Sequence, residues 1–485
     1  MPLAVPPVLS SSEKRFQLYV DCLAPVLGHA DRREPLRLYT TGLLLPGERK
    51  SVEPMAARLD PHRVRSRHQS LHHFVAEADW DDRAVLAATR EYVLPTIQQH
   101  GPIEAWMVDD TGMPKKGQHS VGVAHQYCGQ LGKQANCQVA VSLSVANGQA
   151  SLPIAYRLYL PQDWADDPSR RRKAGVPASV RFQTKPKMAL EQVRQAVSDG
   201  VPRGVVVADI AYGNDTAFRD ELTALGLRYA VGIQAKTTVW SEGAAPLPPP
   251  KYKGTGRPPK LLRRDPDHQP LAVEQLAATL PASAFRTVCW REGTSGKELR
   301  SRFARIRVRA AHRDYWRGQT REPEWLLIEW PDGEKKPTRY WLSTLPKNNS
   351  LRVLVQQAKL RWRVERDYQE LKQEVGLGHY EGRSWRGFHH HATLCIAAYG
   401  FLVAERAAFP PSGTVVQPPC PGPRLPQGFQ PRGAARPSGT TSPALDCDHA
   451  RPLNSRSHRT TVTLSLLSDS ARPQAALSRP TFMTQ

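Results

Sequence analysis

The sequence lacks the features that mark several other classes of protein. Its 485 residues contain no apolar run near the roughly 20 residues that a membrane-spanning helix needs, so we expect no membrane partner. The segment Met1 to Ser12 lacks the charged start and apolar core of a secretion signal. The seven cysteines form no Cys-x-x-Cys pair, which favours a reducing cytoplasm over a disulfide framework. No internal repeats are present.

Acidic residues are few relative to basic ones. The 67 Lys and Arg residues outnumber 45 Asp and Glu residues and give a formal net charge of +22. Such an excess indicates a polyanionic partner, most often nucleic acid, although a basic surface can also serve solubility alone. Hydrophobic residues make up 40% of the chain, enough for the cores of two or three domains.

The first hundred residues show a helical pattern. Residues 1–12 are expected to be disordered, and apolar positions recur at helical intervals between residues 13 and 99. The basic, His-rich stretch Arg49 to His73 lies inside this region. It fits either a small helical DNA-binding domain or a solvated helical face.

Residues 100–233 instead predict a mixed α/β sheet. Asn214 is expected to cap the helix that ends at Gly226. The expected strands and helix, in chain order, are Ile103–Val108, Gln138–Val145, Leu152–Leu160, helix Lys185–Ser198, Gly204–Ala208 and Tyr229–Ile233.

The rest of the chain divides into three parts. Residues 234–345 predict a β-rich insertion with strands near 286–291, 303–308, 325–330 and 339–344. Residues 346–408 predict two helices, over 350–376 and 389–408. Residues 409–485 are rich in Pro, Ser, Gly and Arg and are expected to form a disordered tail.

Three acids stand in positions suited to phosphodiester chemistry. Asp110 and Asp209 each follow an apolar strand, where residues of an α/β sheet line a functional crevice. Each acid alone could equally cap a helix or a turn. Glu365 shares a predicted helix face with Arg361 and Lys372, which fits either a metal ligand beside a phosphate backbone or an ordinary surface ion pair. Acids that hold two divalent ions would support DNA or RNA cleavage.

Ordered motifs over about residues 43–404 carry a family resemblance. They are Asp109–Gly117, His119–Val123, Gln126–Gly129, Asn136–Gln138, Leu158–Pro161, Ala208–Gly213, Arg361–Glu365, Leu371–Lys372 and His379–Trp385. On these motifs the sequence resembles bacterial insertion-sequence transposases of the DDE class, in the group with a Tyr-Arg-Glu-Lys signature around the last carboxylate. The resemblance implies a ribonuclease-H-like α/β fold with a β insertion before the Glu-bearing helix.

The resemblance also implies a set of site residues. It assigns the catalytic and metal-binding triad to Asp110, Asp209 and Glu365, with two Mg²⁺ or Mn²⁺ ions as cofactors. Asp109 is then a neighbour that serves as a control. The signature Arg and Lys fall at Arg361 and Lys372, whose implied role is to grip DNA phosphates. The signature Tyr falls at Ala358, a departure that concerns its contact and not the metal chemistry.

Further basic residues are candidates for DNA contacts. Lys115 and Lys116 lie in the first matched motif. Arg257, in a Gly-Thr-Gly-Arg-Pro-Pro-Lys segment, fits a minor-groove hook or a plain Pro-rich loop. The alternating residues Arg305, Arg307 and Arg309 form a basic strand face or a solvated one. The run His389–His391 is expected to point in different directions on a helix and so not to hold one metal ion together.

The sequence therefore predicts a DNA transposase that cleaves transposon ends and transfers the strands to target DNA. The implied partners are double-stranded DNA, both inverted-repeat ends and target, and a second copy of the chain in a homodimer at the bacterial nucleoid. A catalytically inactive, transposase-derived DNA-binding protein is the main alternative. An RNA-binding or RNA-cleaving protein of the same fold is another, although no aromatic stacking motif for single strands is evident.

Overall fold

A computed structural model describes residues 11–292 and 298–410. The expected disordered start over residues 1–12 and the expected disordered tail over residues 409–485 lie outside the described residues, except for residues 11–12 and 409–410. The first helix begins at Ser12, so the predicted boundary at residue 13 is off by one residue.

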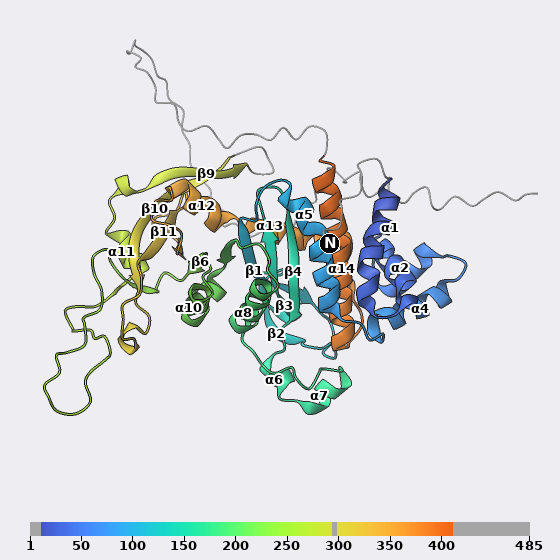
Figure 1. Ribbon diagram of the computed structural model, residues 1–485, viewed down its shortest axis with the longest axis horizontal. Coiled ribbons are helices and arrows are strands. Elements are labelled where there is room, and N and C mark those ends of the chain that lie inside the picture. Colours follow the sequence, from blue (N-terminus) through green and yellow to red (C-terminus); the bar gives the residue numbers. More distant parts are fainter. Residues whose placement is uncertain (1–10, 293–297, 411–485) are drawn as a thin grey trace, which may run out of the picture. The chain divides into compact units, whose positions relative to one another are not determined.

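The core is a five-stranded mixed sheet with the order β4–β3–β1–β5–β6 (Figure 1). β1 is antiparallel to β3 and parallel to β5, and β5 is parallel to β6. Three antiparallel strands followed by two parallel ones is the ribonuclease-H-like arrangement. The strands are β1 (Ala105–Pro114), β3 (Lys133–Ala146), β4 (Ser151–Leu158), β5 (Val205–Ala208) and β6 (Tyr229–Ile233), with β2 (Ala124–Cys128) beside one end of β3.

The insertion is β-rich, as predicted, but it continues the same sheet. β12 pairs with β6, and the order then runs β11, β10, β7, β8, with β9 also on β10. The strands are β7 (Thr238–Trp240), β8 (Leu271–Ala272), β9 (Arg286–Glu292), β10 (Glu298–Ala310), β11 (Glu324–Trp330) and β12 (Arg339–Ser343). The short helix α11 (Val273–Ala278) follows β8. Edge pairing through β12 therefore joins the insertion to the core sheet.

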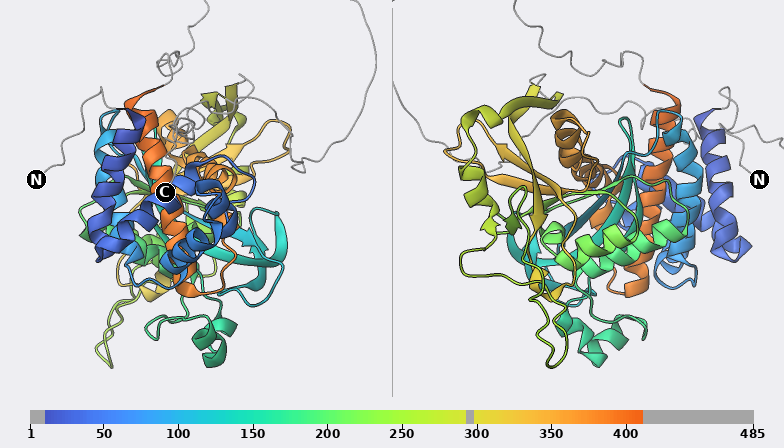
Figure 2. Two further views of the ribbon diagram at one scale, coloured as in Figure 1. Left: turned by 90° about the vertical axis from the view of Figure 1, so that its right-hand side faces the viewer. Right: turned by 60° about the vertical axis from the view of Figure 1, so that its left-hand side comes forward.

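The N-terminal region is helical, as predicted, and packs on the last helix, α14 (Trp385–Ala408). Arg15 forms an ion pair with Glu405 at 2.6 Å, and the Tyr19 hydroxyl donates to the Ala397 carbonyl at 2.7 Å. Both views in Figure 2 show this region beside α14. The helices are α1 (Ser12–Leu23), α2 (Arg33–Leu44), α3 (Val52–Leu59), α4 (Val64–Ala76) and α5 (Asp82–Gln98). Among the described residues, no helix combines the length and apolarity that crossing a membrane would demand.

Helices between the core strands begin close to their predicted positions. α8 spans Lys185–Ser198 as predicted, after the short helices α6 (Gln162–Ala165) and α7 (Pro168–Lys173). α9 (Ile210–Gly213) and α10 (Thr216–Ala224) connect β5 to β6. The predicted cap of α10 is wrong, because Asp215 rather than Asn214 accepts from the Phe218 amide, at 3.1 Å. The Asn214 side chain instead accepts from Thr237 at 3.0 Å and helps to fix the loop after β6.

The predicted single helix over residues 350–376 is broken. α12 (Leu351–Lys359) ends before Leu360, α13 covers Trp362–Glu370, and a π-helical turn follows over Leu371–Val375. The π turn adds a residue to the helical period. Spacing at 3.6 residues per turn therefore does not describe the whole distance from Arg361 to Lys372.

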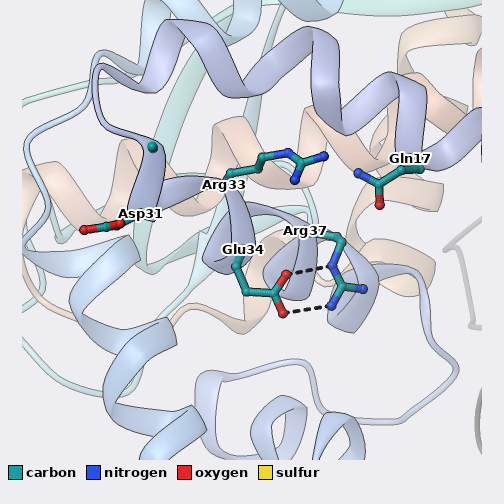
Figure 3. Close-up of a pocket in the computed structure, with 6 residues that line it drawn as sticks. Gln17, Asp31, Arg33, Glu34 and Arg37 are labelled. Carbon is teal, nitrogen blue, oxygen red and sulfur yellow. Dashed lines mark hydrogen bonds and ion pairs between the residues drawn. The ribbon is translucent and has the colours of Figure 1, made fainter.

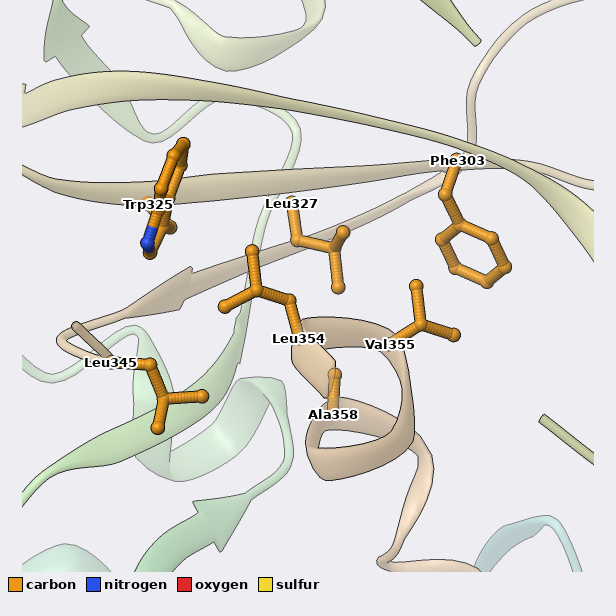
Figure 4. Packing of buried hydrophobic residues seen from close by; sticks show 7 residues of the cluster. All are labelled: Phe303, Trp325, Leu327, Leu345, Leu354, Val355 and Ala358. Carbon is orange, nitrogen blue, oxygen red and sulfur yellow. The ribbon is translucent and has the colours of Figure 1, made fainter. Parts of the chain in front are cut away.

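A buried apolar cluster anchors α12 on the insertion strands (Figure 4). Leu354 and Val355 point from α12 toward β10 and β11. Ala358, at the position where the resemblance predicted a signature Tyr, is also buried in this cluster, so a small side chain suits the space available. The cluster consists of Phe303, Trp325, Leu327, Leu345, Leu354, Val355 and Ala358.

Replacing Leu354 by Ala should lower the free energy of unfolding by roughly 2–5 kcal/mol, because it removes buried methyl groups and leaves a cavity. The neighbouring Val353 is 37% exposed, so Val353→Ala is a matched control. It should change the free energy of unfolding by less than about 0.5 kcal/mol. Urea unfolding followed by tryptophan fluorescence measures both variants. Equal effects would show that α12 is not anchored through Leu354.

The three consecutive histidines of α14 are core residues with separate partners. His389 lies between the Trp385 carbonyl, at 2.9 Å, and the Leu158 amide, at 3.2 Å. His391 lies between the Tyr39 hydroxyl and the Gly376 carbonyl, at 2.9 and 3.0 Å. His390 stacks on Trp80 with ring centroids 3.6 Å apart. The three rings therefore point in different directions, as predicted, and each has its own contacts in the core.

Burial lowers the pKa of His389 and of His391 from 6.5 to about 4, because the charged ring loses its hydration. A histidine with a depressed folded-state pKa stabilises the fold above its unfolded pKa, and that stability is lost as the pH falls from about 6.5 to about 4.

His389→Gln should reduce this loss by roughly 3 kcal/mol, because glutamine can still accept from the Leu158 amide and does not titrate. Urea unfolding at a series of pH values tests this. A variant whose stability depends on pH as steeply as the wild type would contradict it.

Candidate active site

β1 extends beyond its parallel neighbour, and this leaves one edge of the strand open. The β1–β5 pairing ends at Met107 opposite Val207, and β5 itself ends at Ala208. β1 nevertheless continues to Pro114, because β3 pairs with it along its whole length. The prediction that Asp110 ends the first strand is therefore wrong, although Asp209 does follow the end of β5. Among the described residues, no strand pairs with β1 on the β5 side after Met107.

Three carboxylates gather at this open edge. Continuing the parallel register by two residues brings Asp109 opposite Asp209. Each of the three acids offers an oxygen, and these oxygens all lie within 4.8 Å of one another; the acids are Asp109, Asp110 and Asp209.

Asp109 is the most buried of the three acids. It is 7% exposed, and Arg361 contacts its carboxylate at 3.0 Å. Burial raises the pKa of Asp109 to about 7; Arg361 opposes this rise, and the charges of Asp110 and Asp209 add to it. A carboxylate in this setting gains from any additional cation.

Asp110 and Asp209 are held by different groups. The Lys185 ammonium, in the first turn of α8, lies 2.6 Å from Asp110 Oδ2. Asp209 caps α9, and its Oδ1 accepts from the Ala211 amide at 2.9 Å. Gly213 lets α9 lie against β6, because a Cβ there would come within 2.1 Å of the Gly232 carbonyl oxygen. This close packing fixes the turn that carries Asp209.

The residues present fit a divalent metal centre. Asp109 and Asp110 on β1 and Asp209 after β5 offer carboxylate oxygens, which are the ligands that Mg²⁺ and Mn²⁺ prefer. The Tyr212 hydroxyl is fully buried and has no hydrogen-bond partner among the described residues. The charges of all three acids raise its pKa further, after burial itself. A buried unpartnered hydroxyl beside three carboxylates fits a place for a bound ion and its waters.

Glu365 does not join this group of oxygens in the described residues. Its side chain is 58% exposed, and its carboxylate accepts from Arg361 at 2.7 Å. Arg361 thus contacts both Glu365 and Asp109, and it connects the Glu-bearing helix to β1. Burial is the largest single influence on the pKa of Arg361 and lowers it. The combined attraction of Asp109, Glu365 and the other acids is stronger, so the pKa is raised overall.

The other predicted DNA contacts differ in their availability. Lys372 donates to the Gly112 carbonyl at 2.8 Å, and Lys115 donates to the Tyr380 carbonyl at 2.9 Å. Burial lowers the pKa of both ammonium groups. Lys116 is exposed just after β1, and Arg257 is exposed in the loop between β7 and β8.

The basic strand face on β10 is also engaged with the protein. Arg305 and Arg307 lie over the Trp325 ring, at 4.6 and 4.9 Å from its centroid, and each donates to a backbone carbonyl. Arg309 donates to the Arg321 carbonyl at 2.5 Å. These three residues therefore serve packing of the insertion in the form of the protein seen here.

A separate hollow lies between α1 and α2 (Figure 3). Its charged groups are paired, Arg37 with Glu34 at 2.8 Å and Arg33 with Asp21 at 2.5 Å. It contains none of the predicted site residues, and its lining is Gln17, Ala30, Asp31, Arg33, Glu34 and Arg37.

Sequence reasoning missed three residues of the acid cluster's surroundings. Asp109 was expected to be only a control, although its place beside Asp110 could have suggested a shared site. Lys185 carried no signal beyond its position at a helix start. Tyr212 lay inside a matched motif, but nothing in the sequence told that its hydroxyl would be buried beside the acids.

Two comparisons with known proteins bear on this site. A probable transposase for insertion sequence element IS701 from Microchaete diplosiphon is 30% identical over 168 residues. That match covers 34% of this chain and 41% of the relative, so it spans less than half of either protein. The sequence model of the DDE superfamily endonucleases matches residues 22–297, a range that includes Asp110 and Asp209 but ends before Glu365. Since this match covers more than half of the chain, the protein belongs to the DDE superfamily endonuclease family.

Proposed function

We propose that the protein is a transposase that cleaves the ends of its element and joins them to target DNA. The observation that carries this proposal is the convergence of three carboxylates at the open edge of β1. The family match and the similarity to a probable insertion-sequence transposase support it. The substrate is double-stranded DNA, in agreement with a net charge of +22.

Asp110, Asp209 and Glu365 are the proposed metal ligands. Two divalent ions, Mg²⁺ or Mn²⁺, would activate the attacking water or 3′ hydroxyl and stabilise the leaving oxygen. The chain's own contribution is to hold the carboxylates on rigid elements: Asp110 within a paired strand, and Asp209 by its own bond to the Ala211 amide. Asp109 anchors Arg361 and adds negative charge at the same edge.

Glu365 needs a change of position to act as the third ligand. Within residues 11–292 and 298–410, Arg361 is the ion-pair partner of its exposed carboxylate, at 2.7 Å. A DNA phosphate that binds Arg361 would free Glu365 to move toward the acids. One guanidinium cannot form strong bonds to Asp109, Glu365 and a phosphate at the same time. Lys372, Lys115, Lys116 and Arg257 are the further proposed contacts to DNA phosphates and the minor groove. Pairing of two ends calls for a homodimer.

Asp110→Ala, Asp209→Ala and Glu365→Ala should each lower metal-dependent cleavage by about a thousandfold or more, because the carboxylates act as one unit. Binding to end DNA should persist. Cleavage is measured on a labelled duplex copied from the DNA that flanks the gene, with Mg²⁺ or Mn²⁺.

Asp332 is an exposed acid in the turn between β11 and β12. Asp332→Ala is therefore the matched control, and this variant should cleave DNA like the wild type. Full activity of one triad variant would remove that residue from the site. A wild-type protein that binds the duplex and never cleaves it would favour the inactive DNA-binding alternative.

Asp109→Asn should become more stable relative to the wild type as the pH rises from about 4 to about 8. The folded-state pKa of Asp109, about 7, is raised above its unfolded value, so its stabilising effect is present at low pH and is lost as the pH rises through about 7. The difference in unfolding free energy should grow by roughly 2 kcal/mol or more.

Urea unfolding with EDTA measures this difference, and saturating Mg²⁺ should reduce it by offsetting the charge repulsion. A difference that does not change with pH would show that Asp109 is not destabilised by its surroundings.

A further inference from the structure

The ammonium of Lys185 neutralises Asp110, a carboxylate that the proposed reaction needs as a ligand for divalent metal ions. Its ammonium lies 2.6 Å from Asp110 Oδ2, and this is the ion pair that Asp110 forms within the described residues. Conversely, Lys185 forms an ion pair with Asp110 and with no other acid among the described residues. The pair is partly open to solvent, with side-chain exposures of 27% and 21%. It can therefore break without opening the core.

The chain around Lys185 allows the ammonium to move. Lys185 is in the first turn of α8, whose first turn contains no acidic residue that could hold it instead. Its ammonium also lies 5.7 Å from the centroid of the Tyr159 ring, a weak cation–π contact close to the outer limit of about 6 Å. Four flexible methylene groups give a lysine a wide reach from a fixed backbone.

Charge balance indicates where the ammonium goes. Without ions, Lys185 and Arg361 compensate three clustered carboxylates. Ions bound to Asp110 would repel a nearby ammonium, while DNA brings phosphate charge to the same edge.

We propose that Lys185 exchanges Asp110 for a DNA backbone phosphate when divalent ions occupy the acid cluster. This inference rests on the proposed function, and it makes Lys185 a positioning residue that couples ion binding to DNA binding. Such coupling is reciprocal, so each ligand should strengthen the binding of the other.

Lys187 offers a matched control, because it carries the same charge on the same helix and is exposed. Mn²⁺ binding to DNA-free protein is measured by electron paramagnetic resonance for wild type, Lys185→Gln and Lys187→Gln. Lys185→Gln should bind Mn²⁺ about three- to fivefold more tightly than Lys187→Gln, because the competing ammonium is gone.

Binding of a fluorescent duplex copied from the flanking DNA is then measured in EDTA and in Ca²⁺. Like Mg²⁺, Ca²⁺ is a hard cation that binds carboxylate oxygens, so it takes the place of Mg²⁺ in this binding assay. In EDTA the two variants should bind within about twofold of each other, since Lys185 is occupied by Asp110. In Ca²⁺, Lys185→Gln should bind about tenfold more weakly than Lys187→Gln, which is the loss of one charge-assisted phosphate contact.

Equal behaviour of the two variants in both assays would overturn the exchange while leaving the transposase proposal intact. A loss of DNA affinity in Lys185→Gln that is the same in EDTA and Ca²⁺ would also overturn it, because the contact would not depend on ions. A wild-type protein that binds neither Mn²⁺ nor the duplex would contradict the proposed function itself.

Discussion

The pairing of β1 with β5 stops at Met107, and the rest of the site depends on this limit. If β5 were longer, its backbone would occupy the edge where the acids meet. Because β3 supports β1 on its other side as far as Pro114, the strand stays ordered after its parallel partner has ended. An ordered strand with one open edge can carry Asp109 and Asp110 beside Asp209 without a flexible loop.

Most of the fold could be predicted from the sequence, since apolar periodicity identifies regular elements. α8 and β6 were predicted with the bounds that the structure gives them. Pairing between distant strands was not accessible in this way. The continuation of the sheet through β12, and the extension of β1 beyond Val108, both depend on partners far away in the chain. The π turn after Glu370 likewise leaves no mark in local periodicity.

The site could be predicted in part, for a related physical reason. Strand ends pointed to Asp110 and Asp209, and both lie in the acid cluster. The prediction of Glu365 as a ligand was based on helix spacing and on a family resemblance. In the structure, its carboxylate forms an ion pair with Arg361 and does not join the acid cluster of the described residues. Asp109 differs from Asp110 in its burial. Burial depends on tertiary packing, which two adjacent aspartates in a sequence do not reveal. For the same reason, the position of Lys185 beside Asp110 became apparent only from the structure.

The cations that the sequence suggested for DNA binding show a common feature. Arg361, Lys372 and Lys115 all have protein partners, either carboxylates or backbone carbonyls. Contact with a phosphate at these positions must therefore replace an existing bond, and its net gain is smaller than that of an unengaged surface cation. Exposed groups such as Lys116 and Arg257 have no such cost to overcome. Under the proposed function, the sequence-independent attraction to DNA would fall to the exposed charges, while the half-buried cations would respond to how the DNA lies in the site.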